Sequence, residues 1–439
     1  MQFNSFEYIY FFIAVFCITY LLNFRQWYRL RNLYLLVSSY FFYAQLQFWF
    51  VGLLAYITIV TFWGGSIIYK AQQKRGKAKK ELWITILLTL SNLLFFKYAY
   101  MANSSIVLPV GLSFFTFQAL TYTIDIYRKK IAPDSFLNVA LFIAFFPTLL
   151  SGPIERARNI LPLLKCSFPI STNNVQIGIQ LFIWGVFKKI VIADRLAVFV
   201  NEIYYSPSSY SGSTLALAAI FYSFQIYADF SGYADMAIGS ARMLGINVMQ
   251  NFKFPYFAGT IKEFWRRWHI SLTSWFTEYV YISLGGNRVS KARWIFNISS
   301  VFLLSGIWHG ATESFVIWGA MHAVLYLIEH YWGCKQSNIL YTIYVFVMVS
   351  VAWVFFRIPD FTQACYVIQQ IFTNITSPIY WGSSSFSTAL TTLLLIIFLI
   401  KEWHMYKQKR SYNYVEYLLI ILGICLFGVK SSQFVYFQF

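Results

Sequence analysis

Long apolar stretches alternate along the chain with short clusters of lysine and arginine. A helix needs about 20 mostly apolar residues to cross a bilayer, and residues 6–24 form a first stretch of this kind. Residues 32–69 carry no charge between two basic clusters, which predicts two crossings with a turn near residues 45–47. Residues 81–127 also end in a basic cluster and should cross twice, breaking around residues 103–109. The pattern predicts a helical protein with several membrane spans.

The rest of the chain offers further span candidates, several of them short. They are residues 175–200, 214–227, 294–309, 314–332, 339–356, 388–401 and 414–429. By the length rule we expect about 11 to 13 membrane-embedded helices in total. The expected fold class is therefore an all-α, polytopic integral membrane protein.

Two segments depart from a simple span. The apolar residues 136–150 run into Ser151-Gly152-Pro153-Ile154-Glu155-Arg156, which predicts a re-entrant or interfacial loop. Irregular backbone at membrane depth is tolerated only where protein buries it or where it lines a wet cavity. Residues 262–282 mix charges with Trp and Phe at roughly helical spacing, which predicts one or two amphipathic helices at the membrane interface or partly inserted.

Composition excludes an ordinary soluble domain, since 59% of the residues are hydrophobic and only 11% are charged, against about a quarter in soluble proteins. The net charge of +18 comes from clusters between apolar stretches. These clusters are Arg25/Arg29/Arg31, Lys70 to Lys80, Arg128 to Lys130, Lys188/Lys189 and Lys407 to Arg410. Their placement fits the positive-inside rule for cytoplasmic loops and contact with anionic membrane lipids, so we expect no nucleic-acid partner. Glu7 is the only charged side chain before the first cluster, which predicts an external N-terminus.

The sequence offers little sign of a metal or a tightly bound cofactor. Its five cysteines are scattered without CxxC spacing, which argues against a disulfide framework and a thiolate metal site. Neither a His-Glu-x-x-His pattern nor a phosphate-binding loop occurs. The N-terminus lacks a basic region and a cleavage site, so we interpret residues 6–24 as a retained span and not as a signal peptide.

Five histidines are the main candidates for chemistry, because an ionisable residue within a span suggests function and histidine acts as acid or base near neutral pH. His309 ends an apolar run and lies between Gly306 and Gly310, which permit close approach of backbone or ligand. His269 follows Arg266-Arg267-Trp268 and has either an anchoring role or a polar role in a cavity. His322 is more plausibly a structural histidine. The last two, His330 and His404, are expected at the interface or in solvent.

Two aspartates, Asp229 and Asp235, flank Gly232 after an apolar run. We expect a helix break at this glycine. Either carboxylate then caps the following helix at its N-terminus, or the pair gives a polar lining to a substrate path.

Five long motifs together closely resemble the MBOAT superfamily, the membrane-bound O-acyltransferases. They are PVGLSFFTFQALTYTIDIYR (109–128), SGPIERARNILPLL (151–164), QIYADFSGYADMAIGSARMLGI (225–246), NFKFPYFAGTIKEFWRRWHISLTSWFTEYVYISLGGNR (251–288) and SGIWHGATESFVIWGAMHA (305–323). The runs around Asp229 and Leu284 look closer to the bacterial branch that supports alginate and peptidoglycan O-acetylation than to the teichoic acid D-alanyl transferases.

The resemblance implies one transmembrane domain over residues 1–439, with helices around a tunnel. Within it we expect N-terminal helices at 1–130, a catalytic core at 131–335 and C-terminal helices at 336–439. The resemblance makes His309 essential for acyl transfer and places His269 on the cytoplasmic side of the path. The residues expected to bind the donor or line the tunnel are Arg266, Arg267, Trp268, Trp308, Asp229 and Asp235.

The implied activity is transfer of an acetyl group from a cytoplasmic thioester, acetyl-CoA, across the bacterial inner membrane. The acceptor is a hydroxyl of a cell-surface polysaccharide or of a relay partner, such as an SGNH-type acetyltransferase. His309 then acts as general base or carries the acyl group itself. D-alanyl transfer to teichoic acid, transport of an acylated carrier, and a scaffolding role in a polysaccharide export complex remain alternatives.

Overall fold

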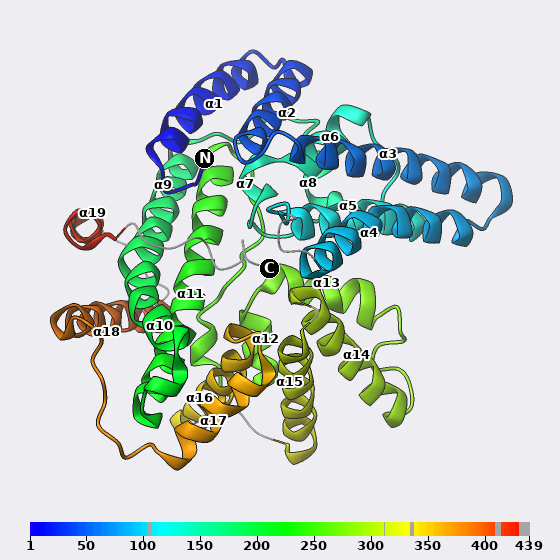
Figure 1. The fold of residues 1–439 in the computed structure, drawn as a ribbon. Coiled ribbons are helices and arrows are strands. Elements are labelled where there is room, and N and C mark those ends of the chain that lie inside the picture. Colours follow the sequence, from blue (N-terminus) through cyan, green and yellow to red (C-terminus); the bar gives the residue numbers. More distant parts are fainter. Residues whose placement is uncertain (103–106, 311, 334–337, 409–413, 430–439) are drawn as a thin grey trace. The chain divides into compact units, whose positions relative to one another are not determined.

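The computed structural model describes residues 1–102, 107–310, 312–333, 338–408 and 414–429, and within these ranges it contains helices and no β-strand (Figure 1). The α-helices of the first half are α1 Phe6–Phe24, α2 Tyr28–Ala44, α3 Phe50–Arg75, α4 Lys79–Ala102, α5 Leu112–Tyr127, α6 Phe136–Ala144, α7 Phe146–Leu149, α8 Ala157–Leu163, α9 Thr172–Phe187, α10 Asp194–Tyr205 and α11 Gly212–Met243. Those of the second half are α12 Ile261–Arg267, α13 Ile270–Trp275, α14 Lys291–His309, α15 Glu313–Trp332, α16 Ile339–Arg357, α17 Phe361–Thr373, α18 Ser385–Gln408 and α19 Tyr414–Phe427. Two π-helices, η1 Lys188–Ala193 and η4 Phe276–Tyr281, and two 3₁₀ turns, η2 Pro207–Ser209 and η3 Pro255–Phe257, interrupt or join them.

The apolar pattern located the N-terminal helices correctly. Helix α1 covers the first predicted span, and α2 and α3 are separated at the predicted turn near residues 45–47. The break predicted around residues 103–109 lies between α4 and α5, although residues 103–106 are outside the described part of the chain.

Six described helices are long and apolar enough, by length and composition, to cross a membrane. They are the helical stretches Phe6–Phe24, Phe50–Arg75, Lys79–Ala99, Thr172–Tyr205, Ile339–Arg357 and Ser385–Lys407. They confirm a polytopic all-α membrane protein. The total of 11 to 13 embedded helices, which also counts short ones, stays a prediction.

The chain forms two compact units that interleave in sequence. The first contains Met1–Ile183 and Tyr233–Gln250, and the second contains Trp184–Gly232 and the chain from Asn251 onward. The predicted three-part division at residues 130 and 335 stays a prediction. In the first unit α3 packs against α4 and α5, which lie beside it in Figure 1.

The irregular loop predicted at residues 151–156 is confirmed in the first unit. Its backbone lies between α7 and α8, and all six side chains are buried. The Arg156 guanidinium donates to the carbonyl of Ile154 at 2.7 Å, and a Glu155 carboxylate oxygen accepts from the backbone N–H of Met249. Protein groups therefore supply hydrogen bonds that water would otherwise provide, as irregular backbone in a membrane protein requires.

Arg31 was expected in a cytoplasmic loop, but the structure places it in the protein interior. The side chain is fully buried in the first unit, and its guanidinium donates to the side chains of Asn23 and Asn32 and to the carbonyls of Leu164 and Cys166 at 2.8–3.1 Å. A guanidinium has five donors in a fixed fork, so this residue ties together segments distant in sequence. Arg31 is a structural cation, whereas Arg29 in the same cluster is exposed.

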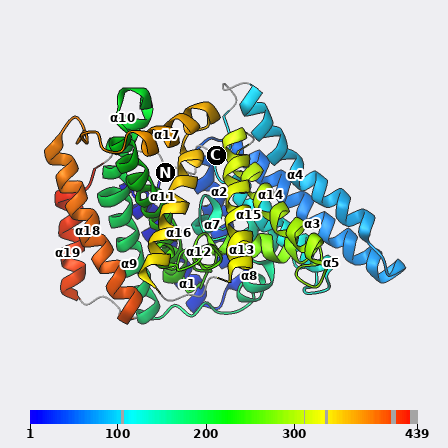
Figure 2. The ribbon, with the colours of Figure 1, turned by 90° about the horizontal axis from the view of Figure 1, so that it is seen from below.

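Helices α14, α15 and α16 pack in succession in the second unit (Figure 2). The segment predicted as amphipathic helices, residues 262–282, consists of α12, α13 and η4. The aromatic side chains of Phe264, Trp268 and Trp275 in this segment are buried within the protein. The helices were therefore predicted correctly, but their aromatic face packs on neighbouring helices of the same unit.

Lys188 and Lys189 correct a second assignment. They were expected in a cytoplasmic loop, but they lie in η1, within the continuous helical stretch Thr172–Tyr205, and both side chains are buried. Lys189 Nζ lies 2.8 Å from Asp194 Oδ1 and 2.8 Å from Asp229 Oδ1, and Lys188 donates to Ser231 Oγ at 3.2 Å. The π-turn brings residues five apart together, since the Asp194 N–H bonds to the Lys189 carbonyl. Lys189 is thus a charge compensated inside the second unit, and Lys188 is a buried hydrogen-bond donor there.

We predict that Lys189→Met destabilises the protein more than Asp229→Asn. The first change leaves two buried carboxylates without their shared cation, whereas the second leaves Lys189 paired with Asp194. Breaking a buried ion pair costs about 3–5 kcal/mol. The melting temperature of the detergent-solubilised protein measures the difference, with exposed Lys291→Met as the matched control. Equal melting temperatures for wild type and Lys189→Met would contradict this account.

Candidate active site

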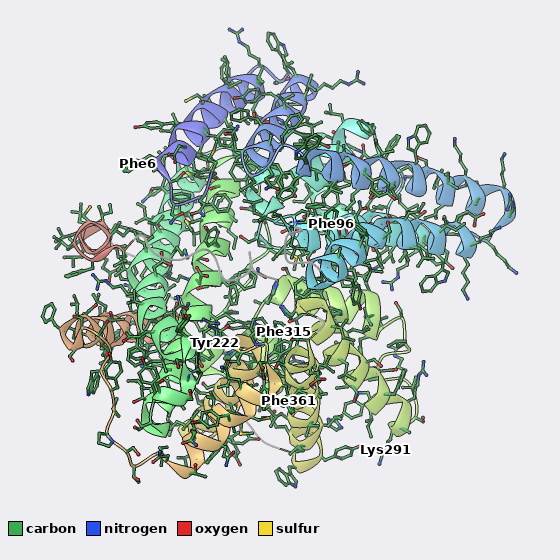
Figure 3. The ribbon with its side chains drawn as sticks, in the orientation of Figure 1. Phe6, Phe96, Tyr222, Lys291, Phe315 and Phe361 are labelled. Atoms are coloured by element: carbon green, nitrogen blue, oxygen red, sulfur yellow. The ribbon has the colours of Figure 1, made fainter. Side chains whose placement is uncertain are left out.

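His309 stands at the C-terminal end of α14, and the close packing of α14 on α15 determines its position. A Cβ atom on Gly319 would lie 2.5 Å from the carbonyl oxygen of Phe302, and one on Gly306 would lie closer still to the carbonyl oxygen of Phe315. Only glycine fits at these two points, so the helices approach as small-residue motifs in membrane proteins allow. This packing carries α14 from exposed Lys291 (Figure 3) to a buried end at His309.

Four aromatic rings enclose the imidazole of His309, which is 5% exposed. The ring centroids of Trp308, Phe356, Trp318 and Phe315 lie 4.5, 4.9, 5.2 and 6.5 Å from it. Phe315, in the first turn of α15, is labelled in Figure 3. The enclosure shields the imidazole, a group able to accept a proton, from bulk water.

His269 lies at the junction of α12 and α13 in a left-handed backbone conformation, with φ +43°. A residue other than glycine adopts this conformation only where its surroundings hold it there. Two backbone hydrogen bonds to residues 251–253 hold His269 in this conformation. The Ile270 N–H donates to the Asn251 carbonyl at 2.9 Å, and the Lys253 N–H donates to the Arg267 carbonyl at 2.9 Å. The side chain of His269 is 1% exposed.

Asn251 fixes the protonation of His269. Its Oδ1 accepts from the Ser271 N–H at 3.2 Å and from the Ser271 hydroxyl at 2.9 Å, and it lies 3.1 Å from His269 Nδ1. An amide oxygen can only accept hydrogen bonds, so Nδ1 of His269 must carry the proton and donate to it. In this tautomer Nε2 carries the basic lone pair. His269 lies outside the six candidate spans, and burial lowers its pKa well below the usual value, which keeps the ring neutral. Sequence reasoning missed Asn251, which lies 18 positions from His269.

Trp308 joins the two motif histidines into one cluster within the second unit. Its ring centroid lies 4.5 Å from that of His309 and 6.4 Å from that of His269. Phe230 from α11 packs edge-on against His269 at 4.6 Å. The histidines are 40 positions apart in the sequence, and the fold brings both to the same indole ring.

His322 belongs to the same aromatic cluster but is held as a core residue. Its Nδ1 accepts from the Trp265 indole N–H at 3.3 Å, and its ring lies 5.1 Å from that of Trp318, which also contacts His309. The four-residue spacing of Trp318 and His322 puts them on one helix face, the signal that could have linked them. His330 and His404 are exposed, as expected.

The two arginines of the Arg-Arg-Trp-His motif face different surroundings. Arg266 lines a cavity of about 240 Å³ together with Lys262, Phe276 and Ser305, and Ser305 lies one turn before His309 in α14. Arg267 forms an ion pair with Glu263 and lies over the Tyr406 ring at 5.1 Å. Arg266 is therefore placed to attract an anionic ligand, whereas Arg267 fastens α12.

The remaining predicted residues are structural in this arrangement. Trp268 is buried between Phe264 and Trp353, with ring centroids at 5.6 and 4.9 Å. Asp229 is held by Lys189. Whether Trp268 or Asp229 also lines a substrate path stays a prediction.

The helix break expected at Gly232 is wrong. Asp229, Gly232 and Asp235 all lie inside the continuous helix α11, so neither aspartate is an N-cap. A Cβ on Gly232 would lie 2.8 Å from the Gly185 carbonyl oxygen, so this glycine permits close helix packing instead of ending a helix. Asp235 lies about 240° around the helix from Asp229, on another face.

Comparisons with known proteins identify the family of this chain. A model of the MBOAT, membrane-bound O-acyltransferase family, matches residues 77–355, a range that contains both motif histidines. The probable alginate O-acetylase AlgI of Pseudomonas aeruginosa is 35% identical over 421 residues, covering 90% of this chain and 79% of the relative. The peptidoglycan O-acetyltransferase of Helicobacter pylori is 30% identical, covering 93% and 91%. The teichoic acid D-alanyltransferase of Bacillus subtilis is 30% identical over 49% of this chain and 57% of the relative. The chain thus belongs to the membrane-bound O-acyltransferase family, as its motifs predicted.

Proposed function

We propose that this O-acyltransferase moves an acetyl group from acetyl-CoA to a hydroxyl of a cell-surface polysaccharide, or of a relay partner that passes it on. The observation that carries the proposal is the aromatic enclosure of His309. Rings at 4.5–5.2 Å shield the imidazole from water, which would otherwise compete with the acceptor hydroxyl for the acyl group. The two relatives that cover most of the chain are named for O-acetylation, which supports the same acyl group.

The proposed reaction needs a base, His309, and a group that positions the donor thioester, His269. His309 accepts the proton of the acceptor hydroxyl as that oxygen attacks the thioester carbonyl. The new C–O bond forms, the C–S bond breaks, and the proton leaves with the thiolate of CoA. In the alternative mechanism, a nitrogen of His309 first attacks the thioester carbonyl and releases the CoA thiolate, so that His309 carries the acetyl group. The acceptor hydroxyl then takes the acetyl group from His309 in a second step. His269 positions the donor thioester at the other side of Trp308.

Orientation in the membrane is part of the proposal. The basic side chains from Lys70 to Lys80 are exposed at the end of α3, in the short connection and at the start of α4, as the positive-inside rule expects of a cytoplasmic turn. This orientation puts the N-terminus outside the bacterial inner membrane and the thioester donor on the cytoplasmic side. An external acceptor protein, such as an SGNH-type acetyltransferase, would receive the acetyl group on the opposite side.

His309→Ala should abolish transfer without loss of the protein from the membrane. Removing a general base reduces a rate by about 10²–10⁴-fold. The measurement is ester-linked acetate on surface polysaccharides in wild type, deletion, and deletion complemented with the variant, with membrane levels compared by immunoblot. His404→Ala, an exposed histidine, is the matched control and should restore acetate fully.

The outcomes of this experiment separate the alternatives. Acetate restored by His309→Ala would refute the catalytic assignment and favour a scaffold. Loss of ester-linked D-alanine in place of acetate on deletion would identify D-alanyl transfer. A transporter would need a proton gradient and would consume no thioester. In a separate assay, acetyl transfer from acetyl-CoA in proteoliposomes without a proton gradient would exclude it.

Arg266→Ala should raise KM for acetyl-CoA about tenfold with little change in kcat, because a charge-assisted hydrogen bond to a phosphate acts on binding. The measurement is the initial rate of thiol release in proteoliposomes over a range of acetyl-CoA concentrations. Lys291→Ala, an exposed cation on α14 outside the cavity, is the control. A fall in kcat at unchanged KM would show that Arg266 does not bind the donor.

A further inference from the structure

The second unit contains a larger cavity that the acyl-transfer site does not use. It has a volume of about 820 Å³ and shares no lining residue with the cavity of Arg266; from α12 it is lined by Glu263, whereas Lys262, Trp265 and Arg266 line the other cavity. Its wall is mostly apolar and aromatic. The residues that matter here are Tyr256, Ile343, Phe346, Leu399, Trp403 and Lys407.

The cavity is bounded by two helices that are each able to span a membrane. Ile343 and Phe346 come from α16, and Leu399 and Trp403 come from α18. Both helices can be followed in Figure 2. Ile343 is 52% exposed and Trp403 is 42% exposed, so the cavity is an open groove whose apolar side faces the surroundings of the spans. In a bilayer those surroundings are lipid chains.

One end of the groove is polar and positively charged. It lies where α16 begins and α18 ends, and Lys407 stands there with its ammonium 4.8 Å above the Trp403 ring. The neighbouring Arg267 is balanced by Glu263, so Lys407 adds a net positive charge to this end. The Trp403 ring beneath the ammonium attracts it, and the Lys407 side chain is exposed at this end of the groove.

We propose that the groove binds one glycerophospholipid with an anionic headgroup. One acyl chain lies along Ile343, Phe346 and Leu399, and the headgroup phosphate accepts hydrogen bonds from Lys407. Apolar length joined to a single cationic end matches this amphiphile, and a soluble anion would leave the apolar wall exposed. By the positive-inside rule the Lys407 end faces the cytoplasm, where anionic lipids attract basic side chains.

The floor of the groove reaches toward the histidine cluster. Tyr256 donates to the Ser223 carbonyl at 2.6 Å and accepts from the Trp353 indole N–H at 3.2 Å. Trp353 lies 4.9 Å from Trp268, the residue directly before His269. A lipid packed on Tyr256 therefore stabilises the side chains of Trp353 and Trp268 next to His269. The binding of this lipid does not depend on which acyl group the enzyme transfers.

The experiment is native mass spectrometry of the purified full-length protein, titrated with dioleoyl phosphatidylglycerol or dioleoyl phosphatidylethanolamine. We expect one phosphatidylglycerol to be retained most tightly by the wild type. Ile343→Trp, which fills the groove, should remove this retained lipid. Lys407→Glu should weaken phosphatidylglycerol about fivefold or more, because one lysine near an anionic headgroup contributes that much. Phosphatidylethanolamine, which has the same phosphate but no net charge, should be weakened less.

Two matched variants serve as controls. Ile59→Trp makes the same change at an exposed position of α3, and Lys80→Glu makes the same charge reversal at the start of α4. Both should bind lipid as the wild type does, and unchanged melting temperatures show that every variant is folded. Equal retention in wild type and Ile343→Trp would overturn the proposal. Displacement of the lipid by acetyl-CoA would also overturn it and assign the groove to the donor.

Discussion

The close approach of helices at glycine positions is the constraint on which the rest of the second unit depends. Gly306 and Gly319 let α14 and α15 pack backbone against backbone, and Gly232 does the same against Gly185. The first contact delivers His309 into its aromatic enclosure. The second brings α11 to the stretch that carries Lys189, so that Asp229 reaches its cation. A single methyl group at Gly232, Gly306 or Gly319 would clash with a carbonyl oxygen, and the site would lose its geometry with the packing.

The second requirement is that buried charge is compensated locally. Lys189 is shared by Asp194 and Asp229, Arg31 is surrounded by carbonyl and amide oxygens, and Arg267 is paired with Glu263. Removing one partner from such an arrangement costs far more than the net value of the interaction. Several cations of this basic chain are therefore parts of its frame. Arg266 is different, because it lines a cavity together with Ser305, one helical turn before His309 in α14.

The proposed chemistry divides its tasks between two histidines with different surroundings. His309 lies among four aromatic rings, which suits a base that works on a small acyl group away from water. His269 is held by Asn251 in one tautomer and in a left-handed conformation, which suits a group that orients a donor. Trp308 contacts both. Tyr256 in the proposed lipid groove contacts Trp353, which packs on Trp268 next to His269. Through these contacts the bound lipid would stabilise the position of His269.

The sequence by itself determined the helical membrane fold, the limits of α1 and the breaks after α2 and α4, because a bilayer imposes length and polarity along the chain. It also made His309 and His269 candidates for the site, since long motifs carry the family resemblance, and it predicted an irregular loop at residues 151–156. Only the tertiary structure decided the roles of Lys188, Lys189 and Arg31, which look like loop cations until distant oxygens are seen around them. It likewise replaced the break at Gly232 with a continuous helix and revealed Asn251. These decisions depend on which helix faces which, and a one-dimensional pattern of polar and apolar positions does not encode partners that the fold alone brings together.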